Sequence, residues 1–303
     1  MRVLVTGATG FLGRHLVAAL RGAGHEVVGT GFGHELTLPG VTLHELDVRD
    51  ADAVARLLAT VRPDAVAHLA ALSHVGESWR RPDEYFAVNV LGVEHLLRHA
   101  GGARFLFISS AEVYGAVPED EQPIRESRPV APRTPYAMTK AAAERLAVGA
   151  GAVVARCFNL LGAGQTTNFA MPSFAAQLAA IAAGRSEARL RVGNLSARRD
   201  FVNVDDAAAA GLLLLTRGEP GEIYNVASGS AWSIEALLGR LQEITAVAAT
   251  TEIDPERLRP VDIPLLCGDA SRLRALGWQP RGGVEAALSA LWEEARGRAA
   301  RRP

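Results

Sequence analysis

The chain has 303 residues, 49% of them hydrophobic, which is enough for one large α/β domain or two closely joined domains. Its formal net charge of −1 leaves no electrostatic basis for binding nucleic acid or an anionic membrane. No apolar run reaches the roughly 18 residues that a membrane span requires.

The first predicted elements are a strand at residues 2–6 and a helix near residues 13–23. Gly7, Gly10 and Gly13 lie between them with the spacing G-x-x-G-x-x-G, which differs from the commoner G-x-G-x-x-G. Such glycines allow a tight turn, close approach of a ligand and close packing of helix on strand. Free amides at the start of the helix would hold a diphosphate. The stretch therefore predicts nucleotide binding.

Strand-like and helix-like segments then alternate through the first half of the chain. The strands fall near residues 26–30, 41–45, 65–71 and 104–110, and the helices near 51–58 and 83–99. This rhythm predicts an α/β fold with a Rossmann-type, doubly wound parallel sheet. Ligands of such sheets collect beyond the carboxyl ends of the strands. The segments at those ends are residues 7–13, 29–31, 47–48, 70–71 and 109–110.

The second half changes character after a strand at residues 153–158. Loops rich in Gly, Asn and Thr, an amphipathic segment at 172–183 and a polar stretch at 191–201 follow. A helix at 205–216 and a strand at 222–226 look like a return to the sheet, and helices at 233–245 and 284–296 come last. We expect two interleaved domains. Residues 1–162 plus 200–227 would form the NAD(P)-binding Rossmann domain, and residues 163–199 plus 228–303 a smaller substrate-binding domain.

A tyrosine and a lysine four residues apart suggest catalysis. Thr134 can cap a helix whose first residue is Pro135, which places Tyr136 in the first turn and Lys140 on the same face. A nearby ammonium and the positive helix end should lower the tyrosine pKa from about 10, so that Tyr136 could exchange a proton with a sugar hydroxyl or carbonyl. By itself, however, this spacing also fits an ordinary amphipathic helix.

Two further features place a reaction at the same edge of the sheet. Residues 109–115, Ser-Ser-Ala-Glu-Val-Tyr-Gly, leave the carboxyl end of a strand, where Ser110 could bond to the reacting oxygen. The glycine loop would bring a hydride carrier to that edge. Together these features predict a hydride-transfer site.

On these motifs the chain resembles the extended short-chain dehydrogenase/reductase family, whose members act on nucleotide-diphosphate sugars. The resemblance runs nearly end to end, through residues 6–13, 68–71, 109–115, 156–159 and 199–201 together with Tyr136 and Lys140. Residues 162–165, 192–201, 259–260 and 267–269 point to the branch of GDP-sugar dehydratases and reductases.

The resemblance implies a set of site residues. Catalysis would fall to Ser110, Tyr136 and Lys140, with Glu112 where similar dehydratases carry a glutamate. The predicted coenzyme contacts are Gly7, Thr9, Gly10, Phe11, Leu12, Gly13, Arg14, Gly31, Asp47, Val48, Leu69, Ala70, Ala71, Asn89, Ser109, Tyr136, Lys140 and Phe158. The predicted substrate contacts are Ser73, Val75, Ser110, Glu112, Asn159, Gln165, Arg199 and Arg259. Guanidinium groups suit a diphosphate, although either arginine could instead form a surface ion pair.

The same Ser-Tyr-Lys set supports three reactions in this family. We favour NAD(P)H-dependent reduction of the 4-keto group of a GDP-4-keto-6-deoxyhexose, giving a GDP-6-deoxyhexose of rhamnose or talose type. A 4,6-dehydratase, with Glu112 as its base, or a C4 epimerase remains an alternative. Against a dehydratase, Ser110 replaces the usual threonine, and residues 31–40 are shorter than the basic segment found there. A non-catalytic NAD(P)-binding module is the distant alternative.

The end of the second strand bears on the choice of coenzyme. An NAD-selective fold usually has Asp or Glu there, whereas this chain has Gly31, so nothing repels a 2′-phosphate. Arg14 could approach that phosphate, although it could equally face solvent, and Asp47 and Val48 would contact the adenine. NADP(H) is therefore favoured, with NAD(H) possible.

Assembly and location follow partly from the resemblance. We expect a homodimer in which helices 83–99 and 137–150 of the two subunits form a four-helix interface. Trp79 and Tyr85 fit either that interface or the core. Cys157 and Cys267 lie in apolar runs without a C-x-x-C partner, which indicates neither a disulfide nor a metal site. The chain opens directly on a strand, so we expect no signal peptide and a cytoplasmic protein.

Overall fold

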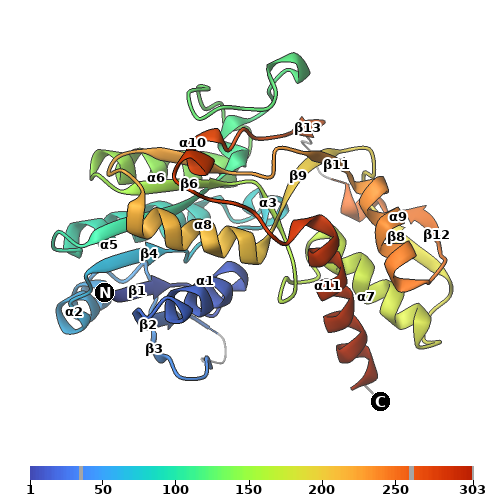
Figure 1. Cartoon of the computed structure of the whole chain (residues 1–303), viewed down its shortest axis with the longest axis horizontal. Coiled ribbons are helices and arrows are strands. Elements are labelled where there is room, and N and C mark those ends of the chain that lie inside the picture. The colour runs from blue at the N-terminus through green and yellow to red at the C-terminus, as the bar shows by residue number, and fades with distance from the viewer. Residues whose placement is uncertain (34–36, 259–262, 302–303) are drawn as a thin grey trace.

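The computed structural model describes residues 1–33, 37–258 and 263–301 and contains a parallel sheet of seven strands (Figure 1). Its spatial order is β10-β6-β5-β4-β1-β2-β3. The strands are β1 (Arg2–Thr6), β2 (Glu26–Gly31), β3 (Thr42–Glu45), β4 (Ala65–His68), β5 (Arg104–Ser110), β6 (Val153–Cys157) and β10 (Ile223–Val226). The strand order reverses between β1 and β4, which is where such sheets bind ligands. The prediction of a Rossmann-type, doubly wound sheet is confirmed.

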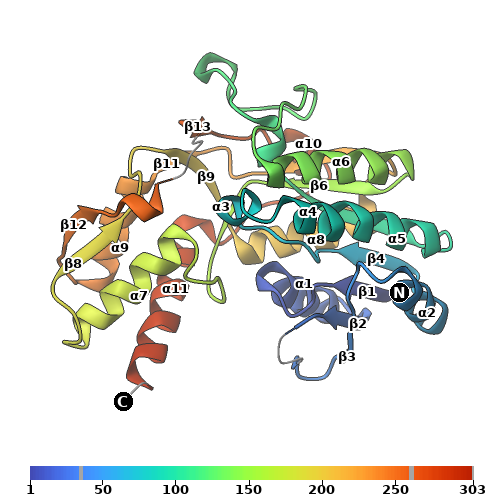
Figure 2. The ribbon, with the colours of Figure 1, turned by 180° about the vertical axis from the view of Figure 1, so that it is seen from behind.

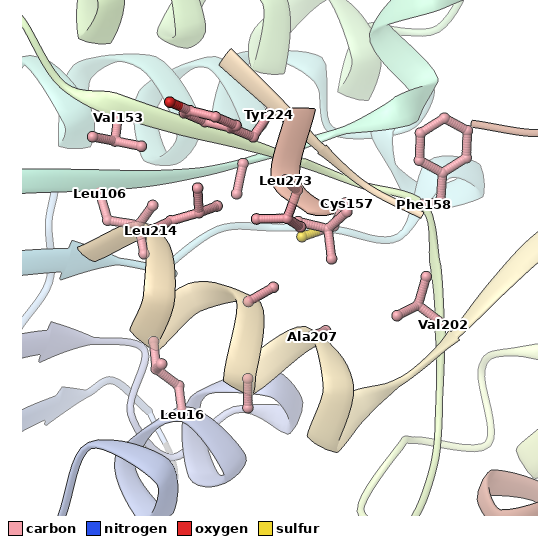
Figure 3. Packing of buried hydrophobic residues seen from close by; sticks show 14 of the residues in the cluster. Leu16, Leu106, Val153, Cys157, Phe158, Val202, Ala207, Leu214, Tyr224 and Leu273 are labelled. Carbon is pink, nitrogen blue, oxygen red and sulfur yellow. The ribbon is translucent and has the colours of Figure 1, made fainter. Parts of the chain in front are cut away.

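Helices cover both faces of this sheet, as its continuous apolar strands require. On one face lie α1 (Phe11–Gly22) and α8 (Val204–Arg217), which are in front in Figure 1. In Figure 3, Leu16 of α1 and Leu214 of α8 share one buried cluster with Leu106 and Val153 of the strands. On the other face lie α2 (Ala51–Val61), α4 (Pro82–Phe86), α5 (Gly92–His99) and α6 (Pro135–Gly149), as Figure 2 shows.

The helix expected at residues 83–99 forms, but with an irregular middle. A π-helical turn, η1 (Ala87–Leu91), joins α4 to α5, and the Gly92 N–H bonds to the carbonyl of Ala87, five residues back. The turn carries the buried Asn89. The Asn89 side chain accepts a hydrogen bond from the Leu72 N–H (2.8 Å) and donates to the Leu72 carbonyl (3.0 Å) and the Thr139 hydroxyl (3.0 Å). The turn thereby joins the loop after β4 to helix α6.

The second half of the chain builds a separate core at the right of Figure 1. Helices α7 (Ala170–Ala182), α9 (Ile234–Thr245) and α11 (Gly283–Ala300) pack there against short strands. These strands are β7 (Asn159–Leu161), β8 (Arg189–Val192), β9 (Arg198–Asn203) and β11 (Ala231–Ser233). The exposed strand β12 (Thr250–Ile253) pairs with β8, and β13 (Leu265–Leu266) pairs with β9 and contributes to the core of the main sheet. The remaining short helices are α3 (Val75–Ser78), η2 (Ala111–Tyr114), η3 (Glu119–Glu121), η4 (Pro255–Arg257) and α10 (Ser271–Ala275).

The division into residues 1–162 plus 200–227 and residues 163–199 plus 228–303 remains a proposal. The helices at 205–216, 233–245 and 284–296 are present with shifted ends, and residues 222–226 return to the main sheet through β10. The polar stretch at 191–201 contains the start of β9, which pairs with β7, β11 and β13 instead of the main sheet. Within the described ranges, none of the helices has the length and apolar character needed to cross a membrane.

Candidate active site

A cavity of about 320 Å³ opens at the carboxyl ends of β1, β4, β5 and β6. The glycine loop forms one wall of this cavity. Ser110, Tyr136 and Lys140 also line the cavity. The other predicted residues that line it are Gly7, Gly10, Phe11, Leu12, Gly13, Leu69, Ala71, Ser73, Val75, Ser109, Glu112, Phe158, Asn159 and Gln165. The structure thus brings most of the predicted coenzyme and substrate residues to one place.

The glycine loop has the geometry that a diphosphate requires. Gly7 has a φ of +67°, and a Cβ there would lie 2.8 Å from the Ala70 nitrogen; a Cβ on Gly13 would overlap the Gly7 carbonyl. Only glycine therefore lets α1 pack this closely on β1. No side chain caps the start of α1 at Gly10, and its first turn holds no acidic residue. These backbone amides and the helix dipole fit the diphosphate of a dinucleotide coenzyme.

Helix α6 positions the tyrosine and the lysine as the sequence predicts. The Thr134 hydroxyl caps it by accepting from the Ala137 N–H at 3.1 Å, and Pro135 is its first residue. Tyr136 and Lys140 are both buried. The Lys140 ammonium donates to the Ile108 carbonyl at 2.6 Å and lies 4.3 Å from the centroid of the Phe107 ring. The lysine therefore ties α6 to the end of β5.

The expected lowering of the Tyr136 pKa is wrong for this structure. Burial raises the pKa of Tyr136, and the charge of Glu112 raises it further, while a hydrogen bond with Ser110 lowers it only in part. Removal of the phenol from water disfavours its charged form, and the sequence could not reveal how deeply the ring is buried. At neutral pH Tyr136 is therefore a protonated phenol that can donate a proton.

Lys140 carries a buried charge that destabilises the fold. Burial lowers the pKa of Lys140 to about 8, from its ordinary 10.5. The native state thus loses this proton at lower pH than the unfolded chain, and stability rises as the pH increases from about 8 to about 10.5.

Replacing Lys140 with methionine should raise the free energy of unfolding at pH 7 by about 2 kcal/mol. This figure is the free energy gained by removing the buried charge, minus the free energy lost with the hydrogen bond to Ile108. The gain should shrink towards zero by pH 10, where native Lys140 is already neutral. Urea denaturation of both proteins at the two pH values measures it. An equal gain at both pH values would attribute the effect to packing and not to charge.

Arg156 and Glu144 form a buried ion pair close to the catalytic residues. The Arg156 guanidinium on β6 binds both carboxylate oxygens of Glu144 on α6, and the Ser109 hydroxyl donates to the same carboxylate at 2.7 Å. Arg156 also lies 4.7 Å from the centre of the Tyr114 ring. This group fixes α6 to β5 and β6. Sequence reasoning missed Glu144, although it follows Lys140 by four residues and so lies on the same helical face.

His68, in the segment 68–71, joins β1 to β4. The Thr6 hydroxyl oxygen accepts from the Leu69 and Ala70 amides (both 3.3 Å), so its own proton goes to His68 Nδ1 at 2.6 Å. Burial, with the charge of Lys140, lowers the pKa of His68 to about 3, and the ring is neutral. Its Nε2 finds no partner among the described residues. Thr6 therefore holds the start of the loop that lines the cavity, and His68 fixes the orientation of the Thr6 hydroxyl.

Several predicted residues lie outside this cavity. Arg14 is exposed and donates to the Thr9 carbonyl at 2.8 Å, and Asn89 bonds to protein groups as described above. Arg49 binds the Asp47 carboxylate through two nitrogens and lowers the pKa of Asp47. Arg199 is buried on β9, where it donates to the Arg198 carbonyl. Gly31, Val48 and Ala70 also do not line the cavity, and Arg259 lies outside the described residues.

Six other residues line the cavity that sequence reasoning did not assign to it. They are Ile108, Ala111, Cys157, Leu160, Phe169 and Leu266. Three of them flank predicted site residues at the ends of β5 and β6, so the rule for strand ends could have found them. Phe169 and Leu266 come from the second half of the chain and carry no local signal.

Comparison with known proteins agrees with this arrangement. The family model described as GDP-mannose 4,6 dehydratase matches residues 4–291. The chain belongs to the GDP-mannose 4,6-dehydratase family. This membership confirms the resemblance to extended short-chain dehydrogenases/reductases that act on nucleotide sugars.

Relatives within and around this family differ in reaction. The chain is 37% identical to a GDP-6-deoxy-D-mannose reductase of Pseudomonas aeruginosa, over 96% of this chain and 97% of that protein. It is 33% identical to a UDP-glucose 4-epimerase of Streptomyces lividans, over 96% and 95% respectively. The solved structure of RMD from Pseudomonas aeruginosa complexed with NADPH has a TM-score of 0.87 to this chain, with 36% identity and coverage of 98% and 99%. Membership in the family therefore leaves the reaction to be argued from the site.

Proposed function

We propose that the protein reduces the 4-keto group of a GDP-4-keto-6-deoxyhexose to a GDP-6-deoxyhexose, using NADPH. One observation carries this choice: the chain is 37% identical to a GDP-6-deoxy-D-mannose reductase over 96% of its length. The site is compatible with it, because Tyr136 lies in the cavity next to Ser110 as a protonated phenol. Such a phenol can supply the proton that reduction of a ketone consumes at the oxygen.

Each catalytic residue then has a defined task. When bound, NADPH would supply the hydride that carbon 4 of the sugar needs. Tyr136 donates its proton to the resulting oxygen, and Ser110 bonds to that oxygen and orients it. The Lys140 ammonium stabilises the tyrosinate left behind. Asn159 and Gln165, on the substrate side of the cavity, would hold the nucleotide sugar.

The reaction can be tested with purified protein. Incubation with NADPH and a GDP-4-keto-6-deoxyhexose should consume one NADPH for each keto sugar, followed by the fall in NADPH absorbance. Nuclear magnetic resonance of the product would then show whether it is of rhamnose or talose type. If NADPH is not consumed, and GDP-mannose loses water instead, the proposal is wrong and the protein is a dehydratase.

One observation keeps the dehydratase or epimerase alternative in view. Glu112 lines the cavity and lies close enough to Tyr136 for its charge to affect the pKa of that phenol. A carboxylate there could remove a proton from the sugar ring, which a 4,6-dehydratase requires. For a reductase, Glu112 would instead position the sugar.

We propose NADPH over NADH as the coenzyme, in line with the NADPH complex of the related structure. Arg14 is the exposed cation next to the glycine loop, and β2 ends in Gly31 without an acid. Arg14→Ala should raise KM for NADPH about tenfold and leave KM for NADH nearly unchanged. Arg21→Ala, on the same helix but bonded to the Pro39 carbonyl, is the control. If steady-state kinetics showed an unaltered coenzyme preference in Arg14→Ala, Arg14 would not contact the 2′-phosphate.

We propose a homodimer formed through α4, η1, α5 and α6. These helices pack side by side (Figure 2) and expose large apolar side chains. Phe86 and Leu91 belong to the first three helices, and Met138 and Leu146 to α6. These exposed apolar side chains on adjacent helices, together named the apolar strip, suit a protein interface. Trp79 is also exposed, whereas Tyr85 is buried.

Replacing Met138 and Leu146 together with glutamate should raise the dimer dissociation constant at least about 30-fold, because unpaired charges would enter an apolar interface. Sedimentation velocity measures the change. Ile253→Glu, an exposed apolar site on β12, is the control and should leave the dimer intact. A monomeric wild-type protein at micromolar concentration would refute the proposed interface.

A cytoplasmic location remains a prediction from the sequence.

A further inference from the structure

The crossover segment, residues 162–169, joins β7 to α7 and separates two hollows. On one side Gln165 and Phe169 line the candidate active site. On the other side lies a groove of about 620 Å³ between α7 and α11, which Gln165 and Thr167 line. Gly164 and residues 166–168 are exposed. Because both sides of the segment are hollow, side-chain packing alone does not fix it in place.

A histidine of helix α1 contacts the crossover segment. His15 of α1 has its Nδ1 2.6 Å from the Asp205 carboxylate of α8 and its Nε2 3.2 Å from the Ala163 carbonyl. The Asp205 carboxylate and the Ala163 carbonyl both present hydrogen-bond acceptors to the ring, one at each nitrogen. The ring of Phe11, which lines the cavity, packs edge-on against His15 at 5.9 Å.

A glutamate of helix α11 contacts the next residue of the crossover segment. The Glu294 carboxylate of α11 accepts a hydrogen bond from the Gly164 N–H at 2.6 Å, and its other oxygen accepts from Arg298. Figures 1 and 2 both show the yellow-green segment between the main sheet's helices and α11. Two polar contacts at adjacent residues therefore join the two halves of the chain.

Gln165 follows these two contacts directly. It is buried, and its amide nitrogen donates to the Leu160 carbonyl at 3.1 Å. Its Oε1 has no hydrogen-bond partner among the residues that the structure describes. A buried acceptor without a donor is unfavourable unless a ligand supplies one. The crossover segment thus presents the Gln165 Oε1 atom, a hydrogen-bond acceptor available to a ligand, in the wall of the substrate cavity.

We propose that His15 and Glu294 are positioning residues that clamp the crossover segment and thereby set the affinity for the nucleotide sugar. The clamp rests on the proposed function, because that function supplies the substrate. Neither contact involves the backbone amides of the glycine loop, but His15 packs against Phe11, which lines the cavity beside that loop. Glu294 holds the segment from α11, so Glu294 is the clamp residue whose replacement should leave coenzyme binding almost unaffected.

His15→Ala and Glu294→Ala should each raise KM for the keto sugar about tenfold. In Glu294→Ala, kcat and the dissociation constant of NADPH should stay within about twofold of wild type. The double variant should lose less than the product of the two factors, since both residues hold one segment. Glu293→Ala is the matched control, because Glu293 pairs with Arg296 on the same helix. Equal losses of sugar and NADPH affinity in Glu294→Ala would overturn the clamp.

Hydrogen exchange tests the clamp independently of activity. Amides of residues 162–169 should exchange faster in His15→Ala and Glu294→Ala but not in Glu293→Ala, at unchanged melting temperature. Unchanged exchange in both variants would refute the clamp even if the enzyme reduces keto sugars. Conversely, faster exchange in a protein that consumes no NADPH would uphold the clamp and refute only the proposed reaction.

Discussion

Tyr136→Phe is expected to lower kcat for keto-sugar reduction about 10³-fold, because the variant has no proton to donate to the developing alkoxide. The ring itself stays buried on α6, so folding and the affinity for NADPH should change little. Single-turnover measurement of NADPH oxidation gives the rate, and fluorescence titration gives coenzyme affinity. A decrease of less than about tenfold would mean that another group, or water, supplies the proton.

Tyr85→Phe is the matched control for this experiment. Tyr85 is buried and packs edge-on against Tyr136 at 6.5 Å, but its hydroxyl donates to the His74 carbonyl. Loss of that hydroxyl should leave kcat within about threefold of wild type, at a cost of about 1 kcal/mol in stability. If Tyr85→Phe lowered kcat as strongly as Tyr136→Phe, the effect would come from packing around α6 and not from proton transfer.

Arg156→Met is expected to reduce the free energy of unfolding by about 3–5 kcal/mol. The variant leaves the buried Glu144 carboxylate without its cation, and an unpaired buried charge is costly. Since Glu144 belongs to α6, which also carries Tyr136 and Lys140, and its carboxylate accepts from Ser109, kcat should fall as well. Urea denaturation measures the loss of stability.

The double variant Arg156→Met/Glu144→Gln separates charge from packing. It removes both charges together, so it should recover part of the lost stability. Arg240→Met is the control, because Arg240 forms exposed ion pairs with Glu243 and Glu285, and its denaturation midpoint should stay close to that of wild type. No recovery in the double variant would mean that the Arg156 side chain stabilises the fold mainly by packing against Tyr114.

The parts of this molecule that the sequence predicts are those with strong local patterns. The main sheet was predictable because its strands are continuous apolar runs, and α6 because Thr134 and Pro135 mark its start. The strands of the second half, such as β7 and β13, have two or three residues and no periodicity, so they escaped prediction. Their positions depend on pairing with β9, which only the folded chain specifies.

The same distinction applies to the site. The residues near Gly7 and Ser110 could be placed because strand ends of a parallel sheet share an edge. The raised Tyr136 pKa could not be foreseen, because it depends on burial by tertiary neighbours. The role of His15 was equally hidden, since Asp205 and Ala163 lie far from it in sequence.

The π-helical turn between α4 and α5 has a consequence on the outside of the molecule as well as inside. In such a turn residues five apart come to lie nearly above one another, because the bond pattern runs i to i+5. Phe86 and Leu91, five apart, are therefore both exposed, while Asn89 points inward to Leu72. Shortening the turn by a single residue would restore the ordinary helical period. It would rotate one half of the helix against the other, so that the outer apolar strip and the inner amide bonds could no longer form together.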